Sequence, residues 1–166
     1  MKEVAPEVLR RARGIRLMIF DVDGVLTDGT LWYGPRGEEL KAFSAHDGHG
    51  IKLLAAAGVA VALLSGRRSK AVAVRARELG IREVHQGVDD KLSVFKKMLA
   101  KHRLKADAAG FMGDELVDLP VLEQCGFACA PREAPEAVRS RVHYVTEAPA
   151  GRGAVRELCD LLVRAA

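Results

Sequence analysis

The chain alternates between short continuous apolar runs and stretches in which apolar residues recur at helical spacing. Continuous runs of four to six residues are typical of strands that are buried on both faces of a sheet. They cover residues 17–22, 59–64, 109–112 and 127–130, with a further one around 84–85. Helical patterns lie between them, at residues 50–57, 69–79, 91–102, 116–124 and 155–163. This alternation predicts an α/β fold, a parallel sheet with helices on both faces.

One segment departs from the alternation. Residues 30–43 hold two short extended stretches around the turn sequence Gly-Pro-Arg-Gly, which predicts a β-hairpin. The segment contains Trp32, the only tryptophan of the chain. Because an isolated two-stranded hairpin is marginally stable in water, we expect this one to pack on its own domain or on another subunit.

Length and composition are typical of a single domain over residues 1–166. With 49% hydrophobic and 29% charged residues, the chain can bury a sizeable core, which excludes a disordered segment or a collagen-like fibre. No apolar run approaches the roughly 20 residues of a membrane helix. The run that follows the basic N-terminus, at residues 17–20, is too short for the core of a signal peptide. We therefore expect a cytoplasmic protein that does not bind membranes.

Charge and cysteine content restrict the partners further. The net charge is +4, and many arginines recur at helical spacing with alanine and valine, which is typical of solvated helix faces rather than of a nucleic-acid surface. A mildly basic protein suits a small anionic substrate. Cys125, Cys129 and Cys159 lack zinc-site spacing, so we interpret them as buried free thiols in a reducing compartment.

The segment DVDGVLTDG, at residues 21–29, carries the strongest chemical signal. Asp21 and Asp23 lie where the first apolar run ends, and residues two apart on a strand point to the same face. Ligands of open parallel sheets bind beyond the carboxyl ends of the strands. Two like charges in one crevice cost stability, which favours a ligand-binding role over a solvated turn with capping aspartates.

Two polar pieces follow later runs. Ser65 and Gly66, in the sequence LLSGR, can offer a hydroxyl and a backbone N–H to a phosphate, although serine is also a common helix cap. Lys91 begins a predicted helix, where its charge opposes the helix dipole. This mismatch favours a ligand-binding role over a surface position.

A fourth piece completes the set. Asp114 and Asp118, in GDELVDLP, are four apart and lie on one side of a helical turn, where capping is the simpler alternative. Carboxylates, a hydroxyl and a lysine at successive strand ends suit Mg²⁺ and a phosphate. A carboxylate nucleophile can form an aspartyl-phosphate, and Mg²⁺ with Lys91 would offset its repulsion from the phosphate dianion.

These four pieces resemble the signature motifs of the haloacid dehalogenase (HAD) superfamily of phosphatases. Their order is similar to that of the capless 3-deoxy-D-manno-octulosonate (KDO) 8-phosphate phosphatases, and the resemblance covers residues 15–162. Further matching segments are GEELKAF at 37–43, DGHGIK at 47–52, QGVDDKL at 86–92 and YVTEAPAGRGAVRELCDLL at 144–162. We expect the first twelve residues, outside the resemblance, to form a frayed helix.

The resemblance implies a fold and a reaction. The fold is a three-layer, Rossmann-like parallel sheet with a protruding hairpin and no cap domain. The reaction is the Mg²⁺-dependent hydrolysis of KDO 8-phosphate through an aspartyl-phosphate, in the lipopolysaccharide sugar pathway of a Gram-negative bacterium. The hairpin would form the central barrel of a homotetramer, with active sites at subunit interfaces. A flexible C-terminal segment at 148–166, which includes residues 151–153, would close over the substrate.

The resemblance also implies roles for individual residues. Asp21 is the nucleophile, and Asp23 is the general acid/base that protonates the leaving sugar oxygen and then activates water. The Asp21 carboxylate, the Asp23 backbone carbonyl and Asp114 hold Mg²⁺. The remaining roles are phosphoryl binding by Ser65, Gly66 and Lys91, orientation of Lys91 or of the metal's waters by Asp118, and binding of the sugar carboxylate by Arg67 and Arg75.

Two positions depart from the family pattern, and three alternatives remain open. Glu115 stands where the family usually has aspartate, and His46 stands where an arginine is expected. The nearest alternative is a phosphatase for a nine-carbon acid, 2-keto-3-deoxynononate 9-phosphate. The second is a phosphoacceptor receiver domain, whose acid pair is adjacent rather than Asp-x-Asp. The third is a non-catalytic tetramerisation module, against which the intact set of Asp21, Asp23, Lys91 and Asp114 argues.

Overall fold

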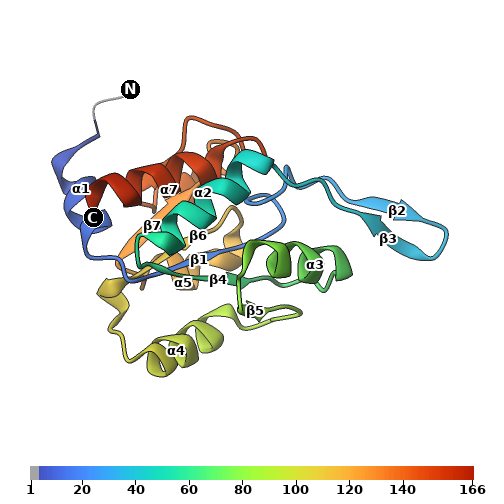
Figure 1. Cartoon of the computed structure of the whole chain (residues 1–166), viewed down its shortest axis with the longest axis horizontal. Coiled ribbons are helices and arrows are strands. Elements are labelled where there is room, and N and C mark those ends of the chain that lie inside the picture. The colour runs from blue at the N-terminus through green and yellow to red at the C-terminus, as the bar shows by residue number, and fades with distance from the viewer. Residues whose placement is uncertain (1–3) are drawn as a thin grey trace.

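A six-stranded parallel sheet forms the centre of the computed structural model, which describes residues 4–166 (Figure 1). The strand order is β5-β4-β1-β6-β7-β8, and every neighbouring pair is parallel. The strands are β1 (Leu17–Phe20), β4 (Ala60–Leu64), β5 (Glu83–His85), β6 (Ala109–Met112), β7 (Phe127–Ala130) and β8 (Tyr144–Val145). The predicted parallel α/β sheet is confirmed.

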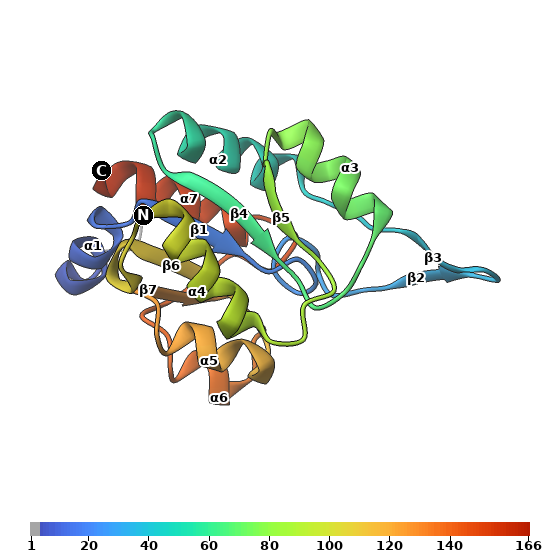
Figure 2. The same cartoon turned by 90° about the horizontal axis from the view of Figure 1, so that it is seen from below.

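Helices cover both faces of this sheet, so the molecule has three layers (Figure 2). One face packs against α1 (Pro6–Arg13), α2 (Ala45–Ala56), α3 (Lys70–Leu79) and α7 (Ala154–Ala165). The other packs against α4 (Lys91–His102), α5 (Leu119–Leu122) and α6 (Glu136–Arg139). Two short 3₁₀ helices, η1 (Ala106–Ala108) and η2 (Leu116–Asp118), flank β6.

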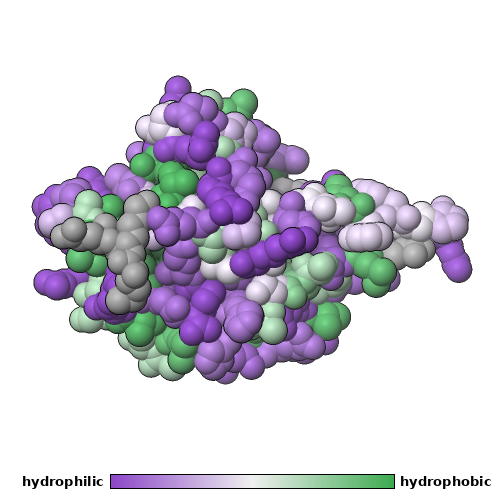
Figure 3. Space-filling model, turned by 90° about the horizontal axis from the view of Figure 1, so that it is seen from above, coloured by the Kyte–Doolittle hydropathy of each residue, from purple (hydrophilic) through white to green (hydrophobic). Residues whose placement is uncertain are grey.

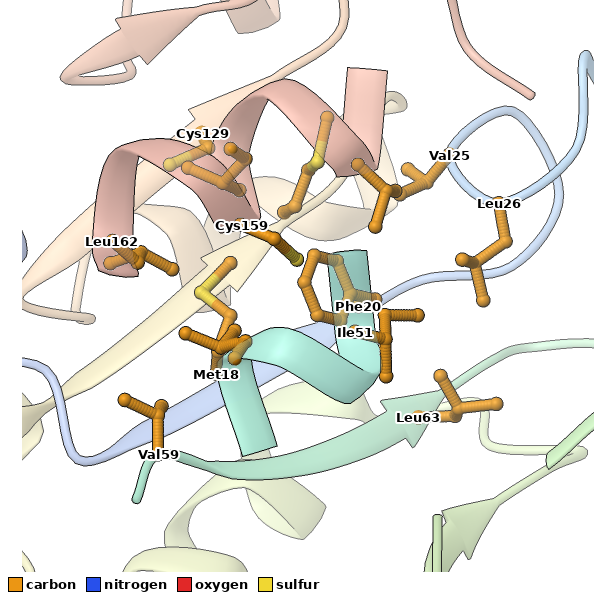
Figure 4. Packing of buried hydrophobic residues seen from close by; sticks show 14 of the residues in the cluster. Met18, Phe20, Val25, Leu26, Ile51, Val59, Leu63, Cys129, Cys159 and Leu162 are labelled. Carbon is orange, nitrogen blue, oxygen red and sulfur yellow. The ribbon is translucent and has the colours of Figure 1, made fainter. Parts of the chain in front are cut away.

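The central strand β1 explains why its sequence is continuously apolar. Met18 and Phe20 point into the core layer beneath α2 and α7, as Figure 4 shows, whereas Leu17 and Ile19 point into the layer beneath α4. All four side chains are fully buried. A strand covered on both faces has no solvent side, so alternation of polar and apolar residues is lost.

Local interactions explain where the elements differ from the predicted ranges. β1 ends at Phe20, and one residue further the N–H of Val22 donates to the side chain of Asp21, at 2.7 Å from Oδ1. α2 begins five residues earlier than predicted, since the Ser44 hydroxyl caps the N–H of Asp47 at 3.2 Å. The predicted helix at 116–124 is divided into η2 and α5.

The N-terminal helix α1 is attached to the body of the protein. Arg13 donates to the carbonyl of Ala165 in α7 at 3.2 Å, and Arg11 donates to the carbonyl of Gly126 at 3.1 Å. The helix expected for the first twelve residues is therefore present from Pro6 onwards, but it packs against α7 instead of being frayed. Residues 1–3 lie outside the described part. The short elements β8 and α6 were not predicted.

The predicted hairpin is confirmed as a separate two-stranded antiparallel sheet, β2 (Trp32–Gly34) and β3 (Gly37–Leu40). It projects from the body as a narrow arm (Figures 1 and 3). Trp32, Tyr33 and Leu40 are 57%, 59% and 64% exposed. The arm thus presents apolar side chains that the chain itself does not cover. Within residues 4–166, no helix is both long and apolar enough to cross a membrane.

The three cysteines are free and buried, as predicted. Burial raises the pKa of Cys125 to about 12 and holds the pKa values of Cys129 and Cys159 well above the usual range. Because the thiolate is the reactive form, we expect none of the three to react with an aromatic disulfide reagent at pH 8 in the folded protein. All three should react after denaturation. A cysteine that reacts equally fast before and after unfolding would contradict this packing.

Candidate active site

The loops that follow β1, β4 and β6 meet at one edge of the sheet, because β1 lies between the other two strands. The first loop residue after each strand still bonds to the next strand. The N–H of Asp21 donates to Met112 at 3.0 Å, and that of Ser65 donates to His85 at 2.9 Å. The backbone of the site therefore has the rigidity of the sheet.

A buried lysine connects two of the predicted acids. Lys91 Nζ lies 2.6 Å from Asp21 Oδ2 and 2.7 Å from Asp118 Oδ1, and all three side chains are at most 10% exposed. Buried charges are tolerated when they are paired and hydrogen-bonded. Burial alone would lower the pKa of Lys91, but Asp21 and Asp118 outweigh it, so the pKa is raised and the ammonium stays charged. This arrangement explains why a lysine begins α4.

Asp118 has a second set of contacts. Its Oδ2 accepts the N–H groups of Asp114 at 3.0 Å and Glu115 at 3.1 Å. One carboxylate thus fixes both Lys91 and the loop that carries Asp114. The exposed Glu115, in contrast, accepts the N–H of Leu116 at 2.7 Å and caps η2. Its longer side chain therefore has a local structural partner outside the acid cluster.

The acid cluster has the composition of a magnesium site. Carboxylate oxygens of Asp21, Asp114 and Asp118 lie within 4.8 Å of one another. Burial, reinforced by the charges of Asp21 and Asp118, raises the pKa of Asp114 to about 8, and burial likewise raises that of Asp21. Three acids share one lysine, and a hard divalent cation would relieve the remaining repulsion. At Gly24, a Cβ would lie 2.1 Å from Asp114 Oδ2, so a side chain there would collide with this carboxylate.

A pocket of about 440 Å³ opens over these groups. Ser65, Gly66, Arg67 and Lys91 line it together with Asp21, Asp23 and Asp114. Since the N–H of Ser65 is used by the sheet, its hydroxyl is the group that remains to face the pocket. The structure thus brings together the residues of all four sequence motifs.

The hairpin supplies a contact that the sequence analysis missed. Lys41, directly after β3, has a side chain with no exposed surface, and its Nζ lies 2.5 Å from Asp23 Oδ1. Arg67 donates to the hydroxyl of Tyr33 on the hairpin and lies 3.8 Å from Asp23 Oδ2. Nothing in the local pattern distinguishes Lys41 from a solvated lysine, because its partner lies eighteen residues earlier in the chain.

Arg75 lies apart from this cluster. It donates to the carbonyl of Ser44 and to Glu78, both at 3.2 Å, and its guanidinium lies 6.0 Å from the centre of the Phe43 ring. His46 is exposed in the first turn of α2. Within the chain, neither residue joins the groups that line the pocket.

A second missed residue positions the C-terminal loop. The buried Asp47 of α2 accepts the N–H groups of Gly153 at 3.3 Å and Arg156 at 2.8 Å, and so caps α7. The N–H of Gly151 donates to the carbonyl of Val25 at 3.2 Å. A Cβ added to Gly151 would lie 2.5 Å from the backbone nitrogen of Asp28. Loop 151–153 therefore contacts the loop that carries the first two catalytic candidates.

Comparisons with known proteins give these motifs a family. No protein-family model matches the chain. The KDO 8-phosphate phosphatase KdsC of Yersinia pestis is 44% identical over 162 residues, which cover 98% of this chain and 87% of the relative. A KDO 8-phosphate phosphatase structure from Moraxella catarrhalis, in complex with magnesium, phosphate and KDO, has a TM-score of 0.93 and 38% identity, covering 96% of this chain and 91% of that one.

A HAD superfamily hydrolase (subfamily III A) from Legionella pneumophila has a TM-score of 0.93 and 42% identity, covering 96% of this chain and 87% of that one. These likenesses confirm the resemblance drawn from the motifs and exclude the receiver domain as the family. They also agree with the fold described above, a parallel sheet with a separate hairpin and no cap domain. The chain belongs to the family of KDO 8-phosphate phosphatases within the HAD superfamily.

Proposed function

We propose that this chain is a Mg²⁺-dependent phosphatase that hydrolyses KDO 8-phosphate to KDO and phosphate. The observation that carries the proposal is the buried Asp21, paired with Lys91 and set beside Asp114 at the carboxyl edge of the sheet. A relative supports the substrate, since the KDO 8-phosphate phosphatase of Moraxella catarrhalis is in complex with magnesium, phosphate and KDO.

Asp21 would attack the phosphorus of the substrate. Its Oδ1 accepts a hydrogen bond from the N–H of Val22 and its Oδ2 accepts one from the ammonium of Lys91, so the carboxylate is fixed in one orientation. As the bond between the Asp21 carboxylate oxygen and phosphorus forms, the bond from phosphorus to the sugar oxygen breaks. Asp23, which enters the cycle protonated when substrate binds, gives that oxygen its proton and becomes a carboxylate. Asp23 then takes a proton from water, whose oxygen attacks the phosphorus and frees Asp21 and phosphate.

Mg²⁺ would be held by the carboxylates of Asp21 and Asp114 and by the backbone carbonyl of Asp23. When bound, it supplies positive charge that offsets the repulsion between the nucleophile and the phosphate. Asp118 is already bonded to Lys91 and to two N–H groups, which favours an orienting role over a place in the metal's coordination.

Lys91 would also bind the phosphate. An ammonium can donate three hydrogen bonds. Asp21 and Asp118 accept two of them, which leaves the third for a phosphoryl oxygen. The hydroxyl of Ser65 and the N–H of Gly66 would bind the other phosphoryl oxygens. Arg67, whose side chain is 44% exposed at the pocket, would meet the sugar carboxylate. Arg75 would reach a sugar only across an interface with another copy, since Ser44 and Glu78 hold it within the chain.

We further propose a cytoplasmic homotetramer that acts in the lipopolysaccharide sugar pathway. The exposed Trp32, Tyr33 and Leu40 of the hairpin support assembly through this arm, and the free cysteines fit a reducing compartment. Neighbouring subunits would cover the pockets, and the segment 148–166 would contribute flexible residues that close over the substrate. In this structure 154–165 form α7, so such closure concerns the loop before it.

Phosphate release from KDO 8-phosphate and from 2-keto-3-deoxynononate 9-phosphate, with Mg²⁺, tests the function. We expect a strong preference for the eight-carbon acid and a loss of at least about 10³-fold in kcat for Asp21→Asn, because the variant lacks the nucleophile. Asp107→Asn, an exposed carboxylate on η1, is the matched control and should keep full activity. A preference for the nine-carbon acid would contradict the proposed substrate. If neither compound is hydrolysed, the proposed phosphatase activity is contradicted.

Thermal unfolding tests the metal site without relying on activity. In metal-free buffer, Asp114→Asn should raise the Tm by about 2–4 °C for each kcal/mol of repulsion removed. Mg²⁺ should raise the Tm of the wild type but not that of the variant, since the variant lacks a charged ligand. An equal rise in both proteins would place the ion elsewhere.

Light scattering coupled to size-exclusion chromatography tests the assembly. We expect the wild type to have the mass of four chains and Leu40→Glu to have a lower mass, because a charge replaces an apolar contact. Val74→Glu, at an exposed valine on α3, is the matched control. A hairpin variant that keeps the mass of four chains would show that the arm is not the interface.

A further inference from the structure

Four side chains of alternating charge form a closed ring beside the pocket. Lys41 Nζ lies 2.5 Å from Asp23 Oδ1 and 3.1 Å from Glu38 Oε2. Arg67 completes the ring, with nitrogens 3.8 Å from Asp23 Oδ2 and 3.8 Å from Glu38 Oε2. Asp23 follows β1, Arg67 follows β4, and the other two belong to the hairpin and its exit. The ring therefore joins the hairpin to two catalytic loops.

The two cations of the ring differ in burial and in distance. The Lys41 side chain has no exposed surface, whereas that of Arg67 is 44% exposed. Long and exposed ion pairs contribute little, but a buried charge that loses its partner is strongly destabilised. Lys41, and not Arg67, is therefore the group that determines where the Asp23 carboxylate lies.

Glu38 holds the other side of the lysine. Its carboxylate is 14% exposed, and it belongs to β3, whose register is fixed by pairing with β2. The ammonium of Lys41 is thus paired with the hairpin sheet on one side and with Asp23 on the other. With Oδ1 of Asp23 bonded to Lys41, Oδ2 is the oxygen left to transfer a proton, since Arg67 lies beyond hydrogen-bond distance from it.

We propose that Lys41 is a positioning residue for the phosphatase reaction, which holds the general acid/base Asp23 by Oδ1 and directs Oδ2 to the leaving oxygen and the attacking water. The inference rests on the proposed role of Asp23. Proton transfer needs a heavy-atom distance of about 2.6–3.2 Å, so a carboxylate free to rotate loses rate without losing substrate affinity. The hairpin, besides projecting for assembly, then sets the geometry of catalysis.

A double-mutant cycle tests this. Lys41→Met is made in the wild type and in Asp23→Asn, and kcat and KM are measured with KDO 8-phosphate and Mg²⁺. If Lys41 acts through Asp23, Lys41→Met should lower kcat about tenfold or more and leave KM within about threefold of the wild type. This size is expected because general acid–base catalysis contributes about 10²–10⁴-fold. In Asp23→Asn the same change should cost less than about twofold. Lys97→Met, at an exposed lysine of α4, is the control and should match the wild type.

Lys41→Gln distinguishes a loss of positioning from a folding defect, because the glutamine amide can still donate a hydrogen bond to Asp23. It should lose less kcat than Lys41→Met, at the Tm and circular dichroism of the wild type. Unchanged kcat in a folded Lys41→Met, or an equal loss in both backgrounds, would overturn the inference. If the wild type does not hydrolyse KDO 8-phosphate, p-nitrophenyl phosphate replaces it in the cycle. Failure of the substrate assignment then stays separate from failure of the role of Lys41.

Discussion

The buried ammonium of Lys91 is the interaction on which the rest of the site depends. Asp21, Asp114 and Asp118 arrive from the ends of β1 and β6, and their oxygens crowd within 4.8 Å of one another. Without a cation among them, the fold would carry two buried carboxylates and one half-buried carboxylate at one edge of the sheet. Lys91 pairs with two of these acids, and its ammonium has a third N–H that the proposed mechanism assigns to the phosphate. The negative charge that remains suits a hard divalent cation, such as the Mg²⁺ of the proposed function.

A second group of charges connects this centre to the hairpin. Lys41 and Glu38 place the arm against Asp23, while Arg67 spans from Tyr33 of the arm to the same carboxylate. Asp47 likewise fixes the C-terminal loop, because its carboxylate accepts the N–H groups of Gly153 and Arg156 at the start of α7. In the proposed mechanism, the nucleophile Asp21 is thus held by the sheet, whereas the general acid/base Asp23 is held by the hairpin. In the proposed tetramer, assembly through the hairpin would thereby be linked to the chemistry.

The sequence predicts what periodicity and strand ends control. Continuous apolar runs predicted the central strands because both faces are covered, and Asp21, Asp23, Ser65 and Asp114 followed from their places after those runs. The opposed dipole at Lys91 was a usable local signal. Lys41 and Asp47 lie in segments that resemble the family, 37–43 and 47–52, but they carried no local signal of their contacts. Their partners lie far along the chain, and an isolated lysine or aspartate gives no sign of burial. The short elements β8 and α6 were missed since two to four residues show no period.

Covalent phosphate on Asp21 is the most direct test of the account. The Asp23→Asn variant, which lacks the base for the second step, would be mixed with Mg²⁺ and p-nitrophenyl phosphate, whose leaving group departs without a general acid. The mixture would be quenched in acid within one turnover and digested for mass spectrometry. The account predicts a phosphate on the peptide that contains Asp21, absent when Asp21→Asn is added to the variant. Phosphate release with no covalent phosphate, or with phosphate on another residue, would contradict it.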